Sequence, residues 1–283
     1  MQGSPHPSPS DTPPIRAEGA RATTGASNGA RRRPPSGVDR SVDQTATAYE
    51  RIEELFVSMQ LLPGSFVRTQ DIQALVGLGR TPVHQAVRRL AAETLIEVRP
   101  RNGLMIAPID LARERHLAFL RRDMIRFVTE AAMRNLSANE RAYVHYLRRQ
   151  LAEAGPAMTL DRFNEIDKSF DLLLIQASGE RFLERALRPL HALARRTGYL
   201  HFTDRSADDG LKRSIALHLA IMDAVLSGDA ERARTTCDDL VAYGIALIDD
   251  LGEGVDPHRL DVGYAPMARG DRRPSDEAPP GGA

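Results

Sequence analysis

Residues 62–106 of the chain read LPGSFVRTQDIQALVGLGRTPVHQAVRRLAAETLIEVRPRNGLMI. Two stripes of apolar residues occur in this stretch, the first made of Ile72, Leu75 and Val76 and the second of Val83, Ala86, Val87 and Leu90. Spacings of three and four residues place side chains on one face of a helix. The intervening Gly77-Leu78-Gly79 supplies a turn. The stretch therefore predicts a helix-turn-helix.

The residues that follow the second predicted helix are typical of a β-hairpin. Apolar residues recur at every second position on both sides of a short tripeptide, at Ile96 and Val98 before it and at Leu104 and Ile106 after it. The tripeptide Arg101-Asn102-Gly103 between them suits the tip of a hairpin. A helix-turn-helix followed by such a wing indicates a protein that binds DNA, and we expect the tip to touch phosphate or the minor groove.

The polar face of the second predicted helix carries His84, Gln85, Arg88 and Arg89. In helix-turn-helix proteins the N-terminal part of this helix faces the base edges, so we expect Arg80, Thr81 and His84 to be the reading residues. An arginine there can pair bidentately with guanine. A basic amphipathic helix is by itself also typical of an ordinary solvated helix. The ordered combination of motifs favours DNA binding.

The composition of the chain places limits on its function. It has 283 residues, with 38 basic and 38 acidic side chains, so DNA binding must come from a local patch of positive charge. The length allows two domains. There is no apolar run long enough to span a membrane and no signal sequence at the start, which predicts a cytoplasmic protein. The single cysteine, Cys237, excludes an intramolecular disulfide and is expected to be a small buried residue.

Changes in composition predict four segments. Residues 1–44 and 253–283 are rich in Pro, Gly and polar residues and are expected to be disordered. A helix that begins near Thr45 leads into the winged helix-turn-helix domain, 45–108. Residues 109–252 show no strand pattern and are predicted to form a bundle of helices over 111–136, 138–155, 159–178, 180–197, 209–227 and 230–251. The predicted fold class is mostly α, with a small β-hairpin wing and a C-terminal all-α bundle.

Polar residues on apolar helix faces mark a candidate site in the bundle. Asp167 lies in a stripe with Phe163, Ile166, Phe170 and Leu174, and Asp171 follows one turn later. His218 lies in a second stripe, with Ile215, Leu219 and Met222. A buried carboxylate needs a partner. A lone inward histidine is usually a satisfied core residue, but the inward carboxylates on another helix favour a binding site.

The winged stretch closely resembles the DNA-binding domain of GntR-family bacterial transcription regulators. The resemblance rests on Leu62-Pro63-Gly64, Leu78–Val83, Ala86–Ala91, Leu95-Ile96 and Arg101-Asn102-Gly103. It implies DNA contacts at Arg68, Thr69, Gln70, Arg80, Thr81, His84, Arg88, Arg101, Asn102 and Gly103. Family members usually have Ser or Thr at the position of Gly79 and Arg at those of Gln70 and His84. The operator sequence therefore does not follow from the resemblance.

The bundle resembles the FCD effector domain of the FadR subfamily of GntR regulators. The matching residues are Ile166–Phe170, Gln176–Gly179, His218–Ala224 and Gly228–Ala233. The resemblance implies an effector pocket that contains Arg121, Asp167, Asp171 and His218, although Arg121 also suits a surface salt bridge.

Many FCD domains hold a divalent metal with one aspartate and three histidines. The matching positions here are Asp167, Asp171, His218 and Leu240. Asp171 can still offer oxygen, whereas Leu240 cannot ligate. Asp167, Asp171 and His218 could hold zinc, manganese or nickel if water or an effector completed the shell. The alternative is a metal-free effector pocket.

Together these resemblances imply a regulator that is not an enzyme. We expect a repressor that binds a palindromic operator as a homodimer and responds to a small organic acid. An acidic, metal-free pocket would also suit a cationic or neutral effector. A DNA-binding architectural protein, or an effector-independent regulator whose bundle serves only dimerisation, is the alternative. A metal-dependent hydrolase is disfavoured, because one ligand is missing and the chain carries a dedicated DNA-binding motif.

Overall fold

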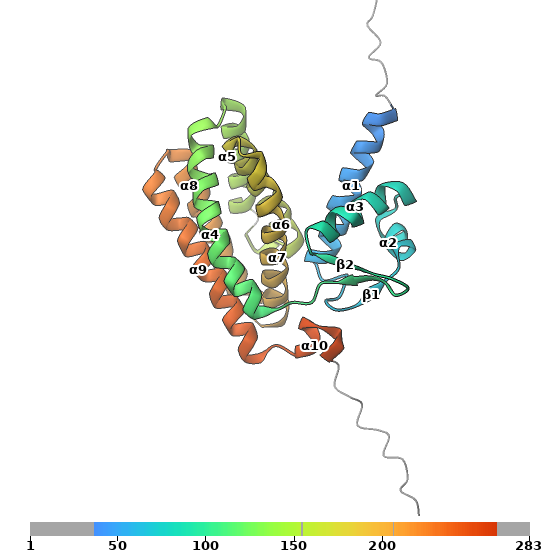
Figure 1. The fold of residues 1–283 in the computed structure, drawn as a ribbon. Helices are drawn as coiled ribbons and strands as arrows, with labels where there is room; N and C mark the ends of the chain where they lie inside the picture. Colours follow the sequence, from blue (N-terminus) through green and yellow to red (C-terminus); the bar gives the residue numbers. More distant parts are fainter. Residues whose placement is uncertain (1–36, 154, 206, 265–283) are drawn as a thin grey trace, which may run out of the picture. The chain divides into compact units, whose positions relative to one another are not determined.

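The computed structural model describes residues 37–153, 155–205 and 207–264 (Figure 1). An N-terminal winged helix-turn-helix domain is followed by a C-terminal bundle of helices, so the predicted mostly α fold class is confirmed. The winged domain consists of α1 (Gly37–Val57), β1 (Phe66–Val67), α2 (Thr69–Val76), α3 (Arg80–Ala92), β2 (Ile96–Arg99) and β3 (Gly103–Ile106).

The helix-turn-helix forms as the apolar stripes predict. α2 ends at Val76 and is capped by Gly77, whose φ of 65° is left-handed, and α3 begins directly after Gly79. Every residue of the second stripe is buried, together with Ile72 and Val76 of the first. Leu75 is the exception, with 59% of its surface exposed. Burial of one face of α3 fixes the opposite, polar face toward solvent.

The wing contains one strand more than the sequence predicts. β3 is the central strand, and both β1 and β2 pair with it in antiparallel fashion. The register of the predicted hairpin pairs Ile96 with Ile106 and Arg99 with Gly103. β1 has only two residues, which is too short to show an alternation in the sequence.

The bundle contains the six helices that the sequence predicts. They are α4 (Leu111–Asn135), α5 (Ala138–Glu153), α6 (Leu160–Ser178), α7 (Arg181–Asp204), α8 (Ala207–Ser227) and α9 (Ala230–Gly254). α7 is longer than predicted, because it continues through Gly198 into a buried turn that contains Leu200. Cys237 is buried as expected, and burial raises the pKa of its thiol to about 11.

The predicted tails are partly wrong. α1 begins at Gly37, so residues 37–44 are helical, while residues 1–36 lie outside the described part of the chain. At the other end, α10 (Pro257–Leu260) and a 3₁₀ turn (Val262–Tyr264) are ordered, and residues 265–283 are not described. The amide of Ile109 donates to the carbonyl of Leu260 at 2.8 Å, and that of Val262 donates to the carbonyl of Pro63 at 3.0 Å. Because these hydrogen bonds join residues that are distant in the sequence, no local sequence pattern predicts that this segment is ordered.

A buried arginine of α7 holds the winged domain against the bundle. Arg196 has no exposed surface, and its guanidinium lies 4.1 Å from the ring centre of Phe56 in α1. It donates to the carbonyl of Ala107 at 2.7 Å, to that of Pro108 at 3.2 Å and to a carboxylate oxygen of Glu114 at 3.3 Å. Burial lowers the pKa of Arg196 to about 10, while Glu114 acts in the opposite direction.

We expect Arg196→Met to destabilise the protein by about 3–5 kcal/mol, because it leaves the carboxylate of Glu114 buried without its cation. Urea unfolding followed by circular dichroism measures this change in the free energy of unfolding. Arg115→Met is the matched control, since Arg115 forms an ion pair with Asp249 at the surface and its loss should cost about 1 kcal/mol or less. Equal losses in the two variants would contradict the assigned role of Arg196.

Candidate DNA-binding surface and effector pocket

The exposed face of α3 forms a shallow, basic groove. Arg80, Thr81, His84 and Arg88 are exposed and line this groove, which has a volume of about 300 Å³, together with Gln85. Gln85 also accepts a hydrogen bond from the hydroxyl of Thr45 in α1 at 2.7 Å. The structure therefore brings the predicted reading residues of α3 together on one surface.

All four predicted DNA-contacting arginines have guanidinium groups without an ion pair to another described residue. Arg68 before α2, Arg80 and Arg88 on α3, and Arg101 at the wing tip are all exposed. A free guanidinium can bind a phosphate or a guanine without first breaking an intramolecular ion pair.

Two neighbouring arginines, by contrast, are engaged in ion pairs with glutamates. Arg89 forms an ion pair with Glu93 at 3.0 Å and lies 4.1 Å from the ring centre of Tyr49. Arg99 forms an ion pair with Glu97 at 2.9 Å. The structure thus distinguishes free from paired arginines within the same two elements, which the sequence pattern could not do.

The wing tip requires glycine at one position. Gly103 has a φ of 95°, and a Cβ atom added there would lie 2.7 Å from the carbonyl oxygen of Val67. Arg101 also has a positive φ, 70°, which turns the chain back at the tip. The other predicted contacts lie at the surface as well: Arg68, Gln70 and Asn102 are exposed, and Thr69 and Gly103 are half-buried.

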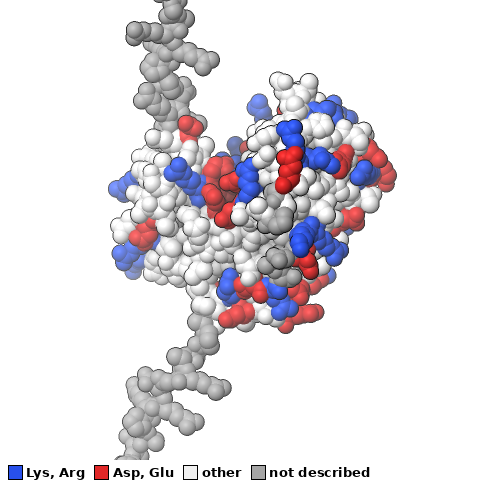
Figure 2. Space-filling view, turned by 180° about the vertical axis from the view of Figure 1, so that it is seen from behind, with Lys and Arg blue, Asp and Glu red and all other residues white. Residues whose placement is uncertain are grey.

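On the face of the molecule that Figure 2 shows, basic and acidic side chains are interspersed, and neither sign covers the surface. This agrees with the zero formal net charge. Attraction to a polyanion therefore depends on local groups such as the free arginines of α3 and the wing.

The bundle contains a cavity of about 100 Å³ where α4, α6, α7, α8 and α9 meet, and we call it the polar cavity because charged side chains line part of it. It is lined by the predicted residues Arg121, Asp167, Asp171 and His218 and by two residues of α7, His191 and Arg195. Nε2 of His218 lies 2.9 Å from Oδ1 of Asp167. Nη1 of Arg195 lies 2.8 Å from Oδ2 of Asp171 and 3.3 Å from Oδ2 of Asp167.

His218 is held as a cation. Its second ring nitrogen, Nδ1, lies 2.7 Å from the carbonyl oxygen of Ser214, so both nitrogens face oxygen acceptors and both can donate only if the ring is protonated. Burial opposes the charge, but the carboxylate of Asp167 outweighs it and raises the pKa of His218. Burial likewise opposes the charge of Asp167, yet His218 and Arg195 hold the pKa of this carboxyl well below its usual range.

The side chains at the positions that resemble an FCD metal site do not fit a metal. Arg195 donates to Asp167 and Asp171, the two carboxylates that would be metal ligands. Leu240 lines the cavity and offers no donor atom. Among the described residues no three His, Cys, Asp or Glu side chains are arranged to hold a metal ion. The predicted metal site at Asp167, Asp171 and His218 is therefore corrected: the cation beside these carboxylates is a guanidinium.

Besides Nε2 of His191, the buried group of the cavity that lacks a hydrogen-bond partner belongs to Arg121. Its Nε atom is buried without a hydrogen-bond partner, and its guanidinium forms no ion pair with a described residue. Burial lowers the pKa of Arg121, and the charges of Asp171 and Asp167 act against this. Gly244 of α9 leaves room beside it, since an added Cβ would lie 3.8 Å from Nη2. The structure thus places Arg121 in the pocket and not in a surface salt bridge.

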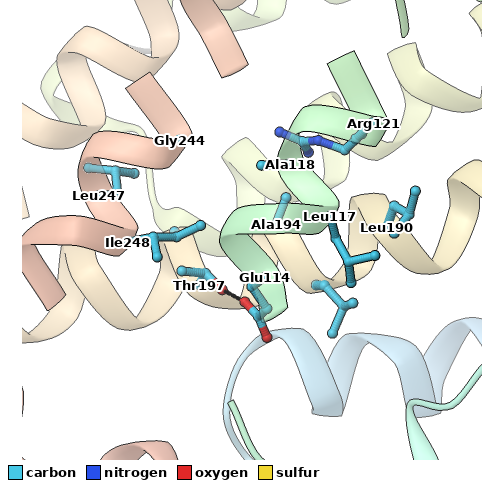
Figure 3. Close-up of a pocket in the computed structure, with 12 residues that line it drawn as sticks. Glu114, Leu117, Ala118, Arg121, Leu190, Ala194, Thr197, Gly244, Leu247 and Ile248 are labelled. Carbon is cyan, nitrogen blue, oxygen red and sulfur yellow. Dashed lines mark hydrogen bonds between the residues drawn. The ribbon is translucent and has the colours of Figure 1, made fainter. Parts of the chain in front are cut away.

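A second, smaller cavity of about 40 Å³ adjoins the first and is also lined by Arg121 (Figure 3). Most of its own lining is apolar, from Leu117, Ala118, Leu190, Leu193 and Ile248, with Glu114 and Thr197 at one end. Both cavities are lined by Arg121, Ala194, Gly198, Gly244 and Leu247. The polar cavity and the apolar cavity are therefore neighbours that share part of their lining.

Ion pairs connect α1 of the winged domain to the bundle beside the polar cavity. Lys168 and Arg188 both pair with Glu50 and Glu53 of α1. Glu53 is almost completely buried, and Lys168, Arg195 and Arg188 lower its pKa against the effect of burial. Lys168 follows Asp167 directly in the sequence. The helix that carries the pocket carboxylates thus also binds the first helix of the DNA-binding domain.

Sequence reasoning missed His191 and Arg195. The available signal was the spacing of Arg188, His191 and Arg195, which places three basic residues on one side of α7. All three are buried, and each contacts a carboxylate of another helix. The acidic partners lie on α1 and α6, so the spacing within α7 alone does not reveal these contacts.

Comparison with known proteins identifies both domains. A family model described as "Bacterial regulatory proteins, gntR family" matches residues 44–106, and one described as "FCD domain" matches residues 116–242. An HTH-type transcriptional regulator in an unstable DNA locus of Streptomyces ambofaciens is 29% identical over 210 residues, which cover 72% of this chain and 83% of the relative. The HTH-type transcriptional repressor RspR of Escherichia coli is 27% identical over 190 residues, covering 66% and 82%.

Solved structures share the fold at lower identity. E. coli McbR/YncC superimposes with a TM-score of 0.65 at 17% identity, covering 74% of this chain and 98% of the other. A transcriptional regulator GntR from Rhodococcus sp. RHA1 gives a TM-score of 0.56 at 16% identity, with the same coverage. No helix of the described residues is long and apolar enough to cross a membrane.

We expect the purified protein to contain far less than one zinc, manganese or nickel ion per chain, because Arg195 already neutralises the two carboxylates. Elemental analysis after dialysis measures this content. A His218→Ala variant is analysed in parallel. One metal ion per chain in the original protein, lost in the variant, would show that Arg195 moves aside and that the site does bind metal.

Proposed function

Because the chain belongs to the GntR family of bacterial regulatory proteins and joins its DNA-binding domain to an FCD domain, we propose that it is a cytoplasmic transcription repressor of the FadR subfamily. It binds a palindromic operator as a homodimer and is controlled by a small organic acid in the bundle. The observation that carries the proposal is that one chain has both exposed arginines without ion pairs on α3 and a buried arginine without a hydrogen-bond partner for its Nε in the bundle cavity.

DNA recognition is assigned to α3 and the wing. Arg80 stands at the first position of α3, where a recognition helix approaches the base edges. Arg88 lies two turns further along the exposed side and is suited to a phosphate, while Arg101 at the wing tip reaches an adjacent groove or backbone. Repression is supported by the E. coli relative that is named a repressor.

Dimerisation is assigned to α4. This helix exposes Leu120 by 63% and Phe127 by 49%, and their spacing of seven residues places both on one side. Phe119, beside them, is 38% exposed. Pairing of two α4 helices would bury this apolar face. A two-fold dimer presents two copies of α3, which matches the two half-sites of a palindrome.

The charge of the polar cavity favours an anionic effector. Arg121, Arg195 and His218 are cations, whereas Asp167 and Asp171 are the carboxylates that face them. One carboxylate added at Arg121 would satisfy its buried donors by a charge-assisted, bidentate interaction. An effector-independent regulator would have no use for an unsatisfied arginine in its core, so the cavity favours an effector-controlled protein.

The ion pairs between the bundle and α1 give a route from effector to DNA. An anion bound at Arg121 changes the balance of charge around Asp167, Asp171 and Arg195. Arg195 in turn acts on Glu53 of α1, which pairs with Lys168. The protein then has two conformations that differ in the ion pairs of α1 and in their affinity for the effector. Binding of the effector shifts the population toward the conformation with the higher affinity. By the same coupling, operator DNA changes the affinity for the effector.

We expect Arg80→Ala to weaken binding to a selected operator by roughly tenfold to a hundredfold, which corresponds to about 1–3 kcal/mol for one bidentate base contact. The operator is first obtained by selection from random duplexes, and affinities are measured by fluorescence anisotropy. Arg89→Ala is the matched control on the same helix, because Arg89 is paired with Glu93. Equal losses in the two variants, or none in Arg80→Ala, would refute the assignment of α3 as the recognition helix.

We expect the double variant Leu120→Asp/Phe127→Asp to be a monomer, because charges on the paired face of α4 repel each other and must be desolvated. Light scattering coupled to size-exclusion chromatography gives the mass. Phe182→Asp is the control, since Phe182 is 80% exposed on α7. A double variant that stays dimeric would exclude α4 as the dimer interface.

A further inference from the structure

We propose that the effector is a short-chain monocarboxylic acid whose carboxylate binds Arg121 and whose apolar tail fills the second cavity, between Arg121 and the winged domain. The inference rests on the proposed effector control and specifies the chemical class of the ligand. It comes from the juxtaposition of two adjoining cavities that share Arg121, one lined in part by charged side chains and the other mostly by apolar ones.

The two cavities offer complementary chemistry to such an acid. The buried Nε of Arg121 lacks an acceptor. In the smaller cavity, which Arg121 also lines, Leu190 and Ile248 present apolar surface beside the small side chain of Ala118 (Figure 3). A second carboxylate on the tail is disfavoured there, because the acidic group at the far end of the cavity is Glu114, which is already engaged by Arg196 and Thr197.

The size of the apolar cavity limits the length of the tail. A volume of about 40 Å³ corresponds to roughly three water-sized groups, since one such group needs about 10–15 Å³. A tail of about three or four carbon atoms fills this space. Butanoate and pentanoate therefore match the cavity, whereas acetate leaves it empty and octanoate exceeds it.

The position of the apolar cavity explains how a tail could reach the DNA-binding domain. Leu193 lines the cavity and also belongs to the core cluster of the winged domain, together with Phe56 and Ala107. Leu117 of α4 packs against the same cluster. At the end of the cavity, Glu114 and Thr197 belong to the hydrogen-bonded junction around Arg196. A tail in this cavity thus presses on residues that hold the two domains together.

The test is isothermal titration of the full chain with the sodium salts of acetate, propanoate, butanoate, pentanoate, hexanoate and octanoate. We expect affinity to rise about fourfold per carbon from acetate to butanoate or pentanoate, as burial of about 0.8 kcal/mol per methylene requires, and to fall at octanoate. Arg121→Met should abolish binding of every acid. Circular dichroism confirms that each variant is folded.

Two variants alter the cavity in opposite directions. Ala118→Leu fills it and should reduce the ratio of pentanoate to acetate affinity about tenfold or more. Ile248→Ala enlarges it and should move the optimum to hexanoate or octanoate. Ile175→Ala is the matched control, because Ile175 is also buried but lies in the bundle core and lines neither cavity, and it should not change the optimum.

The outcomes separate this inference from the proposed function. Equal affinity for all chain lengths, lost in Arg121→Met, would overturn the tail site while leaving the carboxylate effector in place. The tail site would also be overturned if Ile248→Ala and Ile175→Ala shifted the chain length of highest affinity by the same amount. Absence of binding by any acid would remove the anionic effector and the tail site together, while the DNA assignment would stand on its own measurement.

Discussion

The arrangement of the two domains depends on the neutralisation of one buried cation. Arg196 has no access to water, so its charge is tolerated only because carbonyl oxygens of the linker, the carboxylate of Glu114 and the ring of Phe56 surround it. These partners come from α1, the linker and α4. A single side chain of α7 therefore requires all of these segments to stay in place, and any ligand that disturbs Glu114 acts on the junction directly.

The preceding residue of the same helix has a parallel role in the pocket. Arg195 and Arg196 point to different sides of α7, one into the polar cavity and the other into the junction. In the cavity, the guanidinium of Arg195 and the imidazolium of His218 supply the positive charge that Asp167 and Asp171 require. The carboxylate pair is thus satisfied by protein groups alone, and Arg121 is left to face a ligand.

The sequence predicts those parts of the structure that follow from local periodicity. The stripe of α3, the tip of the wing and the inward position of Asp167 and His218 are each visible within a few turns of chain, and the structure agrees with them. Arg195 and the segment around Leu260 were missed, because their partners lie on other helices or more than a hundred residues away. Exposed Leu75 shows that a periodic pattern does not guarantee burial.

The central claim is that a ligand at Arg121 changes the affinity of α3 for DNA. The most direct measurement is the dissociation constant of the operator complex, determined by fluorescence anisotropy with and without saturating pentanoate. The account predicts a clear increase of this constant in the original chain and no change in Arg121→Met. An operator affinity that is the same with and without the acid in the original chain, although the acid binds, would contradict coupling between the pocket and the DNA-binding surface.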